Sequence, residues 1–359
     1  MNRRLASLLK IGISVELVAY LVSSALTKSP ETFIDLYSQP KQWSYLALAT
    51  LCCTLAVLLT FIRWHYLVRA LELPFRLTEA LRLGFLGYLF NLAPMGIVGG
   101  DLLKAVLLAR QQRDRRAQAV ATVVVDRLIG LYVLFLVASV AILAIGLQNS
   151  PEPNVRFACK ATLIVTAVGA LGIAMLFIPG VTSGRLSTML GNLPRVGHVL
   201  ASLLDAVRMY RRKLHVLLVA TLMSVGVHSL FTLGVFLIAC GLYEEVLPLA
   251  THFVIMPVSA SMGVIPLPLG PFEAVLEFFY IQMPGDVKML AGQGLIVALC
   301  YRIITVLIAA VGICYYLGSR QEVAEVIEEA EHEQEAEGPP TPDAAASLAQ
   351  APGACEPAG

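Results

Sequence analysis

The residues of this chain best suited to chemistry lie in two interrupted hydrophobic stretches. In each stretch a carboxylate, Asp101 or Glu273, follows a proline by seven residues, and glycines or prolines lie between them. An arginine inside a long apolar segment follows each carboxylate, with Arg127 26 residues after Asp101 and Arg302 29 residues after Glu273. Paired hydrophobic segments that are interrupted at corresponding places in two halves point to a transporter binding site. The helix-breaking residues are Pro94, Gly96, Gly99, Gly100, Pro266, Pro268, Gly270 and Pro271.

The arginines indicate recognition of an anionic lipid head group. A charge at membrane depth costs roughly 2.5 to 3.5 kcal/mol on an insertion scale, and such residues usually face a cavity or a partner. A guanidinium group suits bidentate contact with phosphate. We therefore expect Arg127 and Arg302 to bind the head group, while Asp101 and Glu273 hold the arginines or meet a cationic substituent. The predicted binding site also includes Asn91, Lys104, Asp126 and Tyr301.

Simpler structural roles remain open for the same charges. An acid at the start of a half-helix caps it and is stabilised by its positive end, which would explain both carboxylates. Lys104 lies three residues after Asp101, so a local ion pair is plausible. Arg127 would avoid burial by extending to the membrane interface or by pairing with Asp126. The matched positions in both halves favour a functional role.

Composition indicates an integral membrane protein. Of 359 residues 57% are hydrophobic and only 14% are charged, and the mean hydropathy is +0.76, which excludes an ordinary soluble domain. The seven cysteines are scattered without a Cys-x-x-Cys spacing, so we expect neither a disulfide framework nor a metal site. We expect no cofactor, and no nucleic acid as a partner.

The apolar segments predict an all-α polytopic protein with about six full spans, since about 20 apolar residues cross a bilayer as a helix. The two interrupted stretches, at about residues 77–109 and 247–283, are additional to these spans. The predicted spans are Leu5–Leu26, Trp43–Ile62, Ala119–Leu147, Phe157–Ile178, Leu214–Cys240 and Met289–Leu317.

Loop charges predict the orientation, because Lys and Arg concentrate on the cytoplasmic side. Two successive basic clusters flank the first interrupted stretch, which must therefore enter from the cytoplasm and return to it. The second stretch then enters from the outside, and both termini are cytoplasmic. This arrangement puts 19 of the 26 basic residues on the inner side. The first cluster, assigned to the second loop, is Arg63, Arg69, Arg76 and Arg82, and the next cluster is Arg110, Arg113, Arg115 and Arg116.

The resulting organisation is an inverted-topology repeat. Residues 1–150 form a first repeat of two spans, a re-entrant helical hairpin and a span, and residues 151–318 form a second with the opposite orientation. Such repeats underlie alternating access in many secondary transporters. A competing arrangement makes each hairpin a pair of complete spans, although each arm is only just long enough.

Residues 319–359 form an acidic cytoplasmic tail. All 26 Lys and Arg residues lie at or before Arg320 and ten of the 25 acids follow it, which leaves +11 on residues 1–320 and −10 on the tail. Few large apolar residues occur there, so we predict disorder apart from a short helix at residues 321–337. The tail is either a site for a protein partner or a solubilising extension.

The interrupted stretches resemble the membrane region of the lysylphosphatidylglycerol synthase family, a flippase-like domain also found alone in bacterial and archaeal proteins. The resemblance covers about residues 5–318. It rests on Asn91 with Pro94, on Gly99-Gly100-Asp101-x-x-Lys104, on Asp126-Arg127 and on the segment from Pro266 to Glu273. The second motif departs from the family's Pro-Gly-Gly-x-Gly-x-x-Glu, with Leu267-Pro268 in place of the glycine pair.

The resemblance implies movement of lipids between leaflets in the bacterial cytoplasmic membrane. The expected cargo is a lipid with a charged or bulky head group, whether anionic, aminoacylated or polyprenyl-linked. In the family, lysyl transfer needs a separate cytosolic domain, and only the acidic tail follows the last span here, so we expect no enzyme. The alternatives are a non-transporting scaffold or regulator of envelope biosynthesis and, less favoured, an aminoacyl- or glycosyl-transferase subunit.

Overall fold

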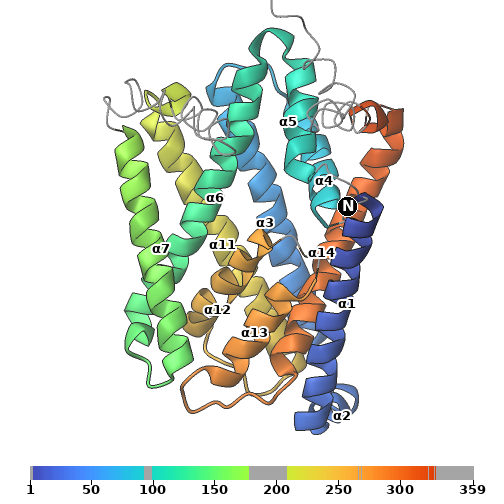
Figure 1. The fold of residues 1–359 in the computed structure, drawn as a ribbon, viewed down its shortest axis with the longest axis vertical. Helices are drawn as coiled ribbons and strands as arrows, with labels where there is room; N and C mark the ends of the chain where they lie inside the picture. The colour runs from blue at the N-terminus through green and yellow to red at the C-terminus, as the bar shows by residue number, and fades with distance from the viewer. Residues whose placement is uncertain are drawn as a thin grey trace, which may run out of the picture.

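Long membrane-length helices form the body of the protein (Figure 1). The computed structural model describes residues 3–92, 99–177, 208–265, 267, 269–321, 323–326 and 328, and every regular element among them is helical. Five of these helices are long and apolar enough to cross a membrane, as expected for a polytopic membrane protein. They are α3 (Trp43–Ala70), α6 (Arg116–Ile145), α7 (Pro153–Phe177), α11 (Leu214–Leu242) and α14 (Gln293–Gly318).

Helix α1 (Arg3–Lys28) has 26 residues, which is long enough for the sixth predicted span, but it is less apolar than the other five. A sixth span at this place therefore stays a prediction. The short helix α2 (Glu31–Ser38) follows α1. The hydroxyl of Thr32 donates a hydrogen bond of 3.0 Å to the carbonyl oxygen of Ala291, which ties this end of the chain to the segment before α14.

Helices α3 and α11 pack against each other at the centre of the bundle (Figure 1). Small residues allow this approach: a Cβ atom at Gly234 would lie 2.7 Å from the Cys53 sulfur. Between membrane helices the association depends on close van der Waals packing rather than on a hydrophobic driving force, so small interface residues are favoured. The contact joins the first half of the chain to the second.

Four shorter helices occupy the two interrupted stretches. They have 16, 12, 13 and 12 residues, or about 18 to 24 Å at 1.5 Å per residue, which is less than the roughly 30 Å of a hydrocarbon core. The first two lie toward one end of the bundle in Figure 1 and the last two toward the other. These helices are α4 (Leu77–Leu92), α5 (Gly100–Gln111), α12 (Leu249–Ser261) and α13 (Pro271–Gln282).

The short helices pack in a reciprocal pattern. Helix α4 lies against α5 and α14, and α12 lies against α13 and α6. Helix α5 also packs on the long helix that follows it, α6, and α13 packs in the same way on α14. Each pair of short helices thus contacts the last long helix of both halves of the chain.

Two of the predicted helix-breaking glycines are required by close packing. A Cβ atom at Gly100 would overlap the backbone carbonyl of Gly87, so a glycine at the start of α5 lets α5 approach α4. Gly270 has φ of +109°, and a Cβ atom there would overlap the side chain of Leu17 on α1. Gly99 precedes α5 and Pro271 is the first residue of α13. Pro94, Gly96, Pro266 and Pro268 lie outside the described residues.

The beginning of the acidic tail continues the fold. Residues 323–326 are helical, and Val323 and Val326 are buried in a cluster with residues of α4 and α5. The carboxylate of Glu325 lies 3.4 Å from the guanidinium of Arg110 on α5. The predicted tail helix is therefore present where the chain is described, and residues 329–359 lie outside the described part.

Replacing Gly100 by alanine should destabilise the protein, because the new methyl group overlaps the carbonyl oxygen of Gly87. Overpacking of this kind costs about 1–3 kcal/mol, and more where backbone cannot move. The measurement is the thermal unfolding midpoint of the purified protein in detergent. Gly99→Ala is the matched control, since its Cβ atom would meet nothing within 4 Å. Equal midpoints for the two variants would contradict the packing assignment.

Candidate functional site

Asp101 lies in the first turn of α5 and forms the centre of a three-residue charge cluster. Its Oδ1 atom accepts from the Arg127 guanidinium on α6 in a short contact, and it lies 3.0 Å from the Lys104 ammonium. The side chains of Asp101 and Arg127 are 35% and 47% exposed, whereas that of Lys104 is 5% exposed. Sequence reasoning predicted all three residues, and the structure brings them together.

Lys104 is the fixed member of this cluster. Its methylene groups pack against Gly87, and its ammonium lies 5.3 Å from the centre of the Trp64 ring. A desolvated ammonium over an indole gains a cation–π attraction. Asp101 therefore has a permanent buried partner in Lys104 in addition to the more exposed Arg127. The guanidinium of Arg127 is the part of the cluster that an anion can reach.

Glu273 and Arg302 form the corresponding pair in the second half of the chain. Glu273 Oε1 accepts from Arg302 Nε at 3.0 Å and from Arg302 Nη2 at 2.7 Å. Its other oxygen, Oε2, accepts from the Gly270 backbone N–H at 2.7 Å, which caps α13. Glu273 is fully buried and the Arg302 side chain is 23% exposed. Glu273 thus both caps its helix and holds the arginine.

The remaining predicted residues support these pairs. Asn91 Oδ1 accepts from the Gly100 backbone N–H at 2.9 Å, which joins the end of α4 to the start of α5. The guanidinium of Arg302 lies 5.7 Å from the centre of the Phe272 ring. Tyr301 packs its ring between Phe272 and Phe231, with centroid distances of 5.4 and 6.2 Å. Aromatic rings therefore line the apolar side of the second pair.

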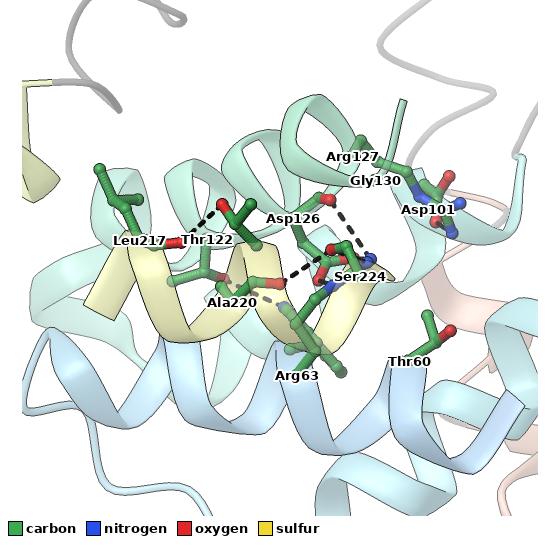
Figure 2. Close-up of polar contacts among 12 residues, drawn as sticks. Thr60, Arg63, Asp101, Thr122, Asp126, Arg127, Gly130, Leu217, Ala220 and Ser224 are labelled. Carbon is green, nitrogen blue, oxygen red and sulfur yellow. Dashed lines mark hydrogen bonds and ion pairs between the residues drawn. The ribbon is translucent and has the colours of Figure 1, made fainter. Parts of the chain in front are cut away.

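A third ion pair, between Arg63 and Asp126, lies beside Arg127 and is deeply buried (Figure 2). Arg63 on α3 donates to both carboxylate oxygens of Asp126, from Nε to Oδ1 at 2.8 Å and from Nη2 to Oδ2 at 3.0 Å. Its Nη1 atom donates to the Ser224 hydroxyl on α11 at 2.7 Å. Arg63 and Asp126 are 3% and 1% exposed. This network connects three long helices, α3, α6 and α11.

The network sets the direction in which Arg127 points. Successive residues on an α-helix point about 100° apart, so fixing Asp126 against α3 turns the next side chain toward α5. Figure 2 shows Arg127 directed toward Asp101 and away from Arg63. Asp126 is engaged by Arg63, and Asp101 rather than Asp126 pairs with Arg127. Asp126 therefore positions Arg127 by fixing the rotation of α6.

Assigning Arg63 to a cytoplasmic loop was wrong. Helix α3 extends to Ala70 rather than ending near Ile62, so Arg63 lies inside the bundle. The apolar run Trp64 to Val68 beyond Arg63 contains only His65 as a polar residue, and this run was the signal for a longer helix. Arg63 is the member of the site that sequence reasoning missed.

The two halves differ in charge and in access. The first half gathers three cations, Arg63, Lys104 and Arg127, around two carboxylates, whereas the second pairs Arg302 with Glu273. The site as a whole therefore carries one excess positive charge, and Arg127 is its most exposed cation. Among the described residues, no group of three His, Cys, Asp or Glu side chains is placed to hold a metal ion.

A comparison with protein families identifies the chain. The family model for the lysylphosphatidylglycerol synthase TM region matches residues 7–312, which include every residue of both charge pairs. The chain belongs to this family. No curated protein sequence matches the chain. Family membership and the five apolar helices together establish an integral membrane protein.

Removing one member of the Arg63–Asp126 pair should strongly destabilise the protein, because the other charge is left buried. Arg63→Met or Asp126→Leu alone is expected to lower the free energy of unfolding by about 3–5 kcal/mol, and the double variant should recover most of the loss. Thermal or denaturant unfolding in detergent measures the effect. Glu325→Gln, which removes a largely exposed pair with Arg110, should change stability by about 0–1 kcal/mol. Additive losses in the double variant would contradict the pairing.

Proposed function

We propose that this member of the lysylphosphatidylglycerol synthase TM family moves a lipid with a charged or bulky head group between the leaflets of its membrane. The observation that carries the proposal is the pair of carboxylate–arginine contacts, one in each half of the chain. Both contacts join the first turn of a short helix to the following long helix. The protein carries out no covalent step in this proposal, and the lipid is cargo.

The proposal includes two re-entrant hairpins, α4–α5 and α12–α13, which enter from opposite faces. Their helices are shorter than a full span, and the two hairpins lie toward opposite ends of the bundle (Figure 1). Helices α4, α5 and α6 of the first half correspond to α12, α13 and α14 of the second. The contacts of α4 with α5, of α5 with α6 and of α4 with α14 correspond to those of α12 with α13, of α13 with α14 and of α12 with α6. This reciprocity supports an inverted repeat, the arrangement in which one half rocks against the other around a central site.

The charges favour an anionic head group, including the phosphate that most membrane lipids carry. Arg127 offers a planar guanidinium that is about half exposed, and its bond to Asp101 is shared with Lys104. An incoming phosphate can therefore replace Asp101 at Arg127 without leaving that carboxylate unpaired. The same exchange at Arg302 would free a fully buried Glu273 carboxylate, so we expect it only when the second half opens.

Orientation follows from the loop charges. We propose that the open Arg127 pair faces the cytoplasmic side, with both termini in the cytoplasm of a bacterial cell, because the basic clusters around α4 and α5 follow the distribution of cytoplasmic loops. The Glu273–Arg302 pair then faces the outer side. A lipid would meet one arginine on each side of its path.

Neutralising any member of the two pairs should slow lipid exchange between leaflets. For purified protein in liposomes, Arg127→Gln, Arg302→Gln, Asp101→Asn and Glu273→Gln should each lower the exchange of a head-group-labelled anionic lipid by about tenfold or more, the loss expected for one charged hydrogen bond. The measurement is the fraction of label accessible to a membrane-impermeant quencher over time.

Arg320→Gln is the matched control, since Arg320 is an exposed arginine just beyond the end of α14 and should leave exchange unchanged. Wild-type exchange in all four site variants would overturn the proposed site. No exchange by the wild-type protein for anionic, aminoacylated and polyprenyl-linked lipids alike would favour a scaffold.

A further inference from the structure

An apolar cavity lies on the flank of the bundle, apart from the charge pairs. A cavity of about 480 Å³ opens between α6, α7 and α11, in the size range of small-molecule sites. Its lining is almost entirely apolar, and it lies among three helices that are long enough to cross the membrane. Six of the lining residues are Leu128 and Tyr132 on α6, Gly169 and Gly172 on α7, and Leu217 and Leu218 on α11.

The cavity results from the sequence of α7. Helices α6 and α7 are tied by the hydroxyls of Ser139 and Thr166, 2.6 Å apart, and they diverge toward the end where α11 begins (Figure 1). In the diverging part α7 presents glycines: a Cβ atom at Gly169 would lie 3.3 Å from the Tyr132 ring, and one at Gly172 would meet nothing within 4 Å. Ordinary side chains at these two positions would narrow the space between the helices.

One end of the cavity meets a basic segment. Tyr210 lines the cavity, is fully buried, and donates from its hydroxyl to the Leu67 carbonyl oxygen at 2.7 Å. The six-residue segment 208–213, which contains Tyr210, carries four basic side chains. Lys213 contacts the Ala70 carbonyl oxygen at the end of α3 and lies 3.5 Å from Glu72, which fixes this segment beside the long helices. The cations are Arg208, Arg211, Arg212 and Lys213.

We infer that this flank binds one anionic phospholipid, with an acyl chain in the cavity between α6, α7 and α11 and the phosphate at residues 208–213. The apolar lining matches a hydrocarbon chain, and clustered Lys and Arg at a span end attract anionic head groups. The positive charge of residues 208–213 would favour an anionic lipid over a neutral one. Arg127 points from α6 toward α5, so this site is separate from the proposed transport path.

Photolabelling tests this site directly. Purified protein is reconstituted in phosphatidylcholine vesicles that contain a trace of phosphatidylglycerol with a diazirine on its acyl chain, and adducts are located by peptide mass spectrometry after illumination. Adducts are expected on the cavity-lining residues of α6, α7 and α11. Gly172→Phe should remove most of them, because its ring fills the open space, while adducts on other lipid-facing helices stay unchanged.

Matched controls separate the cavity from general contact with lipid. Leu171→Phe adds a ring at a neighbouring exposed position of α7 outside the lining and should leave cavity labelling unchanged. Arg212→Gln should weaken labelling, whereas Lys160→Gln, an exposed cation nearer the other end of α7, should not. Labelling is compared only between variants that elute from a size-exclusion column at the same volume as the wild-type protein.

Three outcomes would overturn the inference. The first is an absence of cavity adducts in the wild-type protein. The second is cavity labelling that persists undiminished in Gly172→Phe. The third is equal labelling by diazirine phosphatidylcholine and diazirine phosphatidylglycerol, which would remove the requirement for an anionic head group. None of these outcomes depends on leaflet exchange, so the proposal of a lipid site on the flank and the proposal of transport can be disproved independently.

Discussion

An ionised side chain inside an apolar bundle needs a partner, and three ion pairs among the residues that the structure describes join different helices. Burying an unpaired charge is strongly unfavourable, so each pair ties together the elements that carry its two members. Arg63 and Asp126 join α3 to α6, with Ser224 adding α11. Asp101 joins α5 to α6, and Glu273 joins α13 to α14. The rotation of these helices about their axes is therefore fixed by charge as well as by packing.

The two carboxylates at the starts of short helices have unequal freedom. Both oxygens of Glu273 are used, one by Arg302 and one by the Gly270 N–H, so its arginine is held in place. Asp101 divides its interaction between a buried lysine and an exposed arginine. Under the proposed function, the arginine of the first half is the one that can change partner, and the arginine of the second half binds lipid only after a conformational change.

Much of this arrangement was predictable from the sequence because its signals are local. Seven-residue spacing from proline to carboxylate located the short helices, and the rarity of charge in apolar segments singled out Arg127 and Arg302. Arg63 was missed because its partner is 63 residues away, and because an arginine six residues before Arg69 looks like part of a loop cluster. Which acid pairs with Arg127 was equally undecidable, since the choice depends on how α6 is rotated against α3. The cavity beside α7 depends on where two helices diverge, which periodicity does not specify.

Leaflet exchange by the protein in a membrane of defined composition tests the central claim most directly. The measurement compares protein-free liposomes, wild-type protein and the double variant Arg127→Gln/Arg302→Gln, using a head-group-labelled anionic phospholipid. If the two arginines bind the lipid on its path, the wild type should exchange the lipid faster than protein-free liposomes, and the double variant should exchange it at least about tenfold more slowly than the wild type. Exchange in the double variant at the wild-type rate would contradict the account.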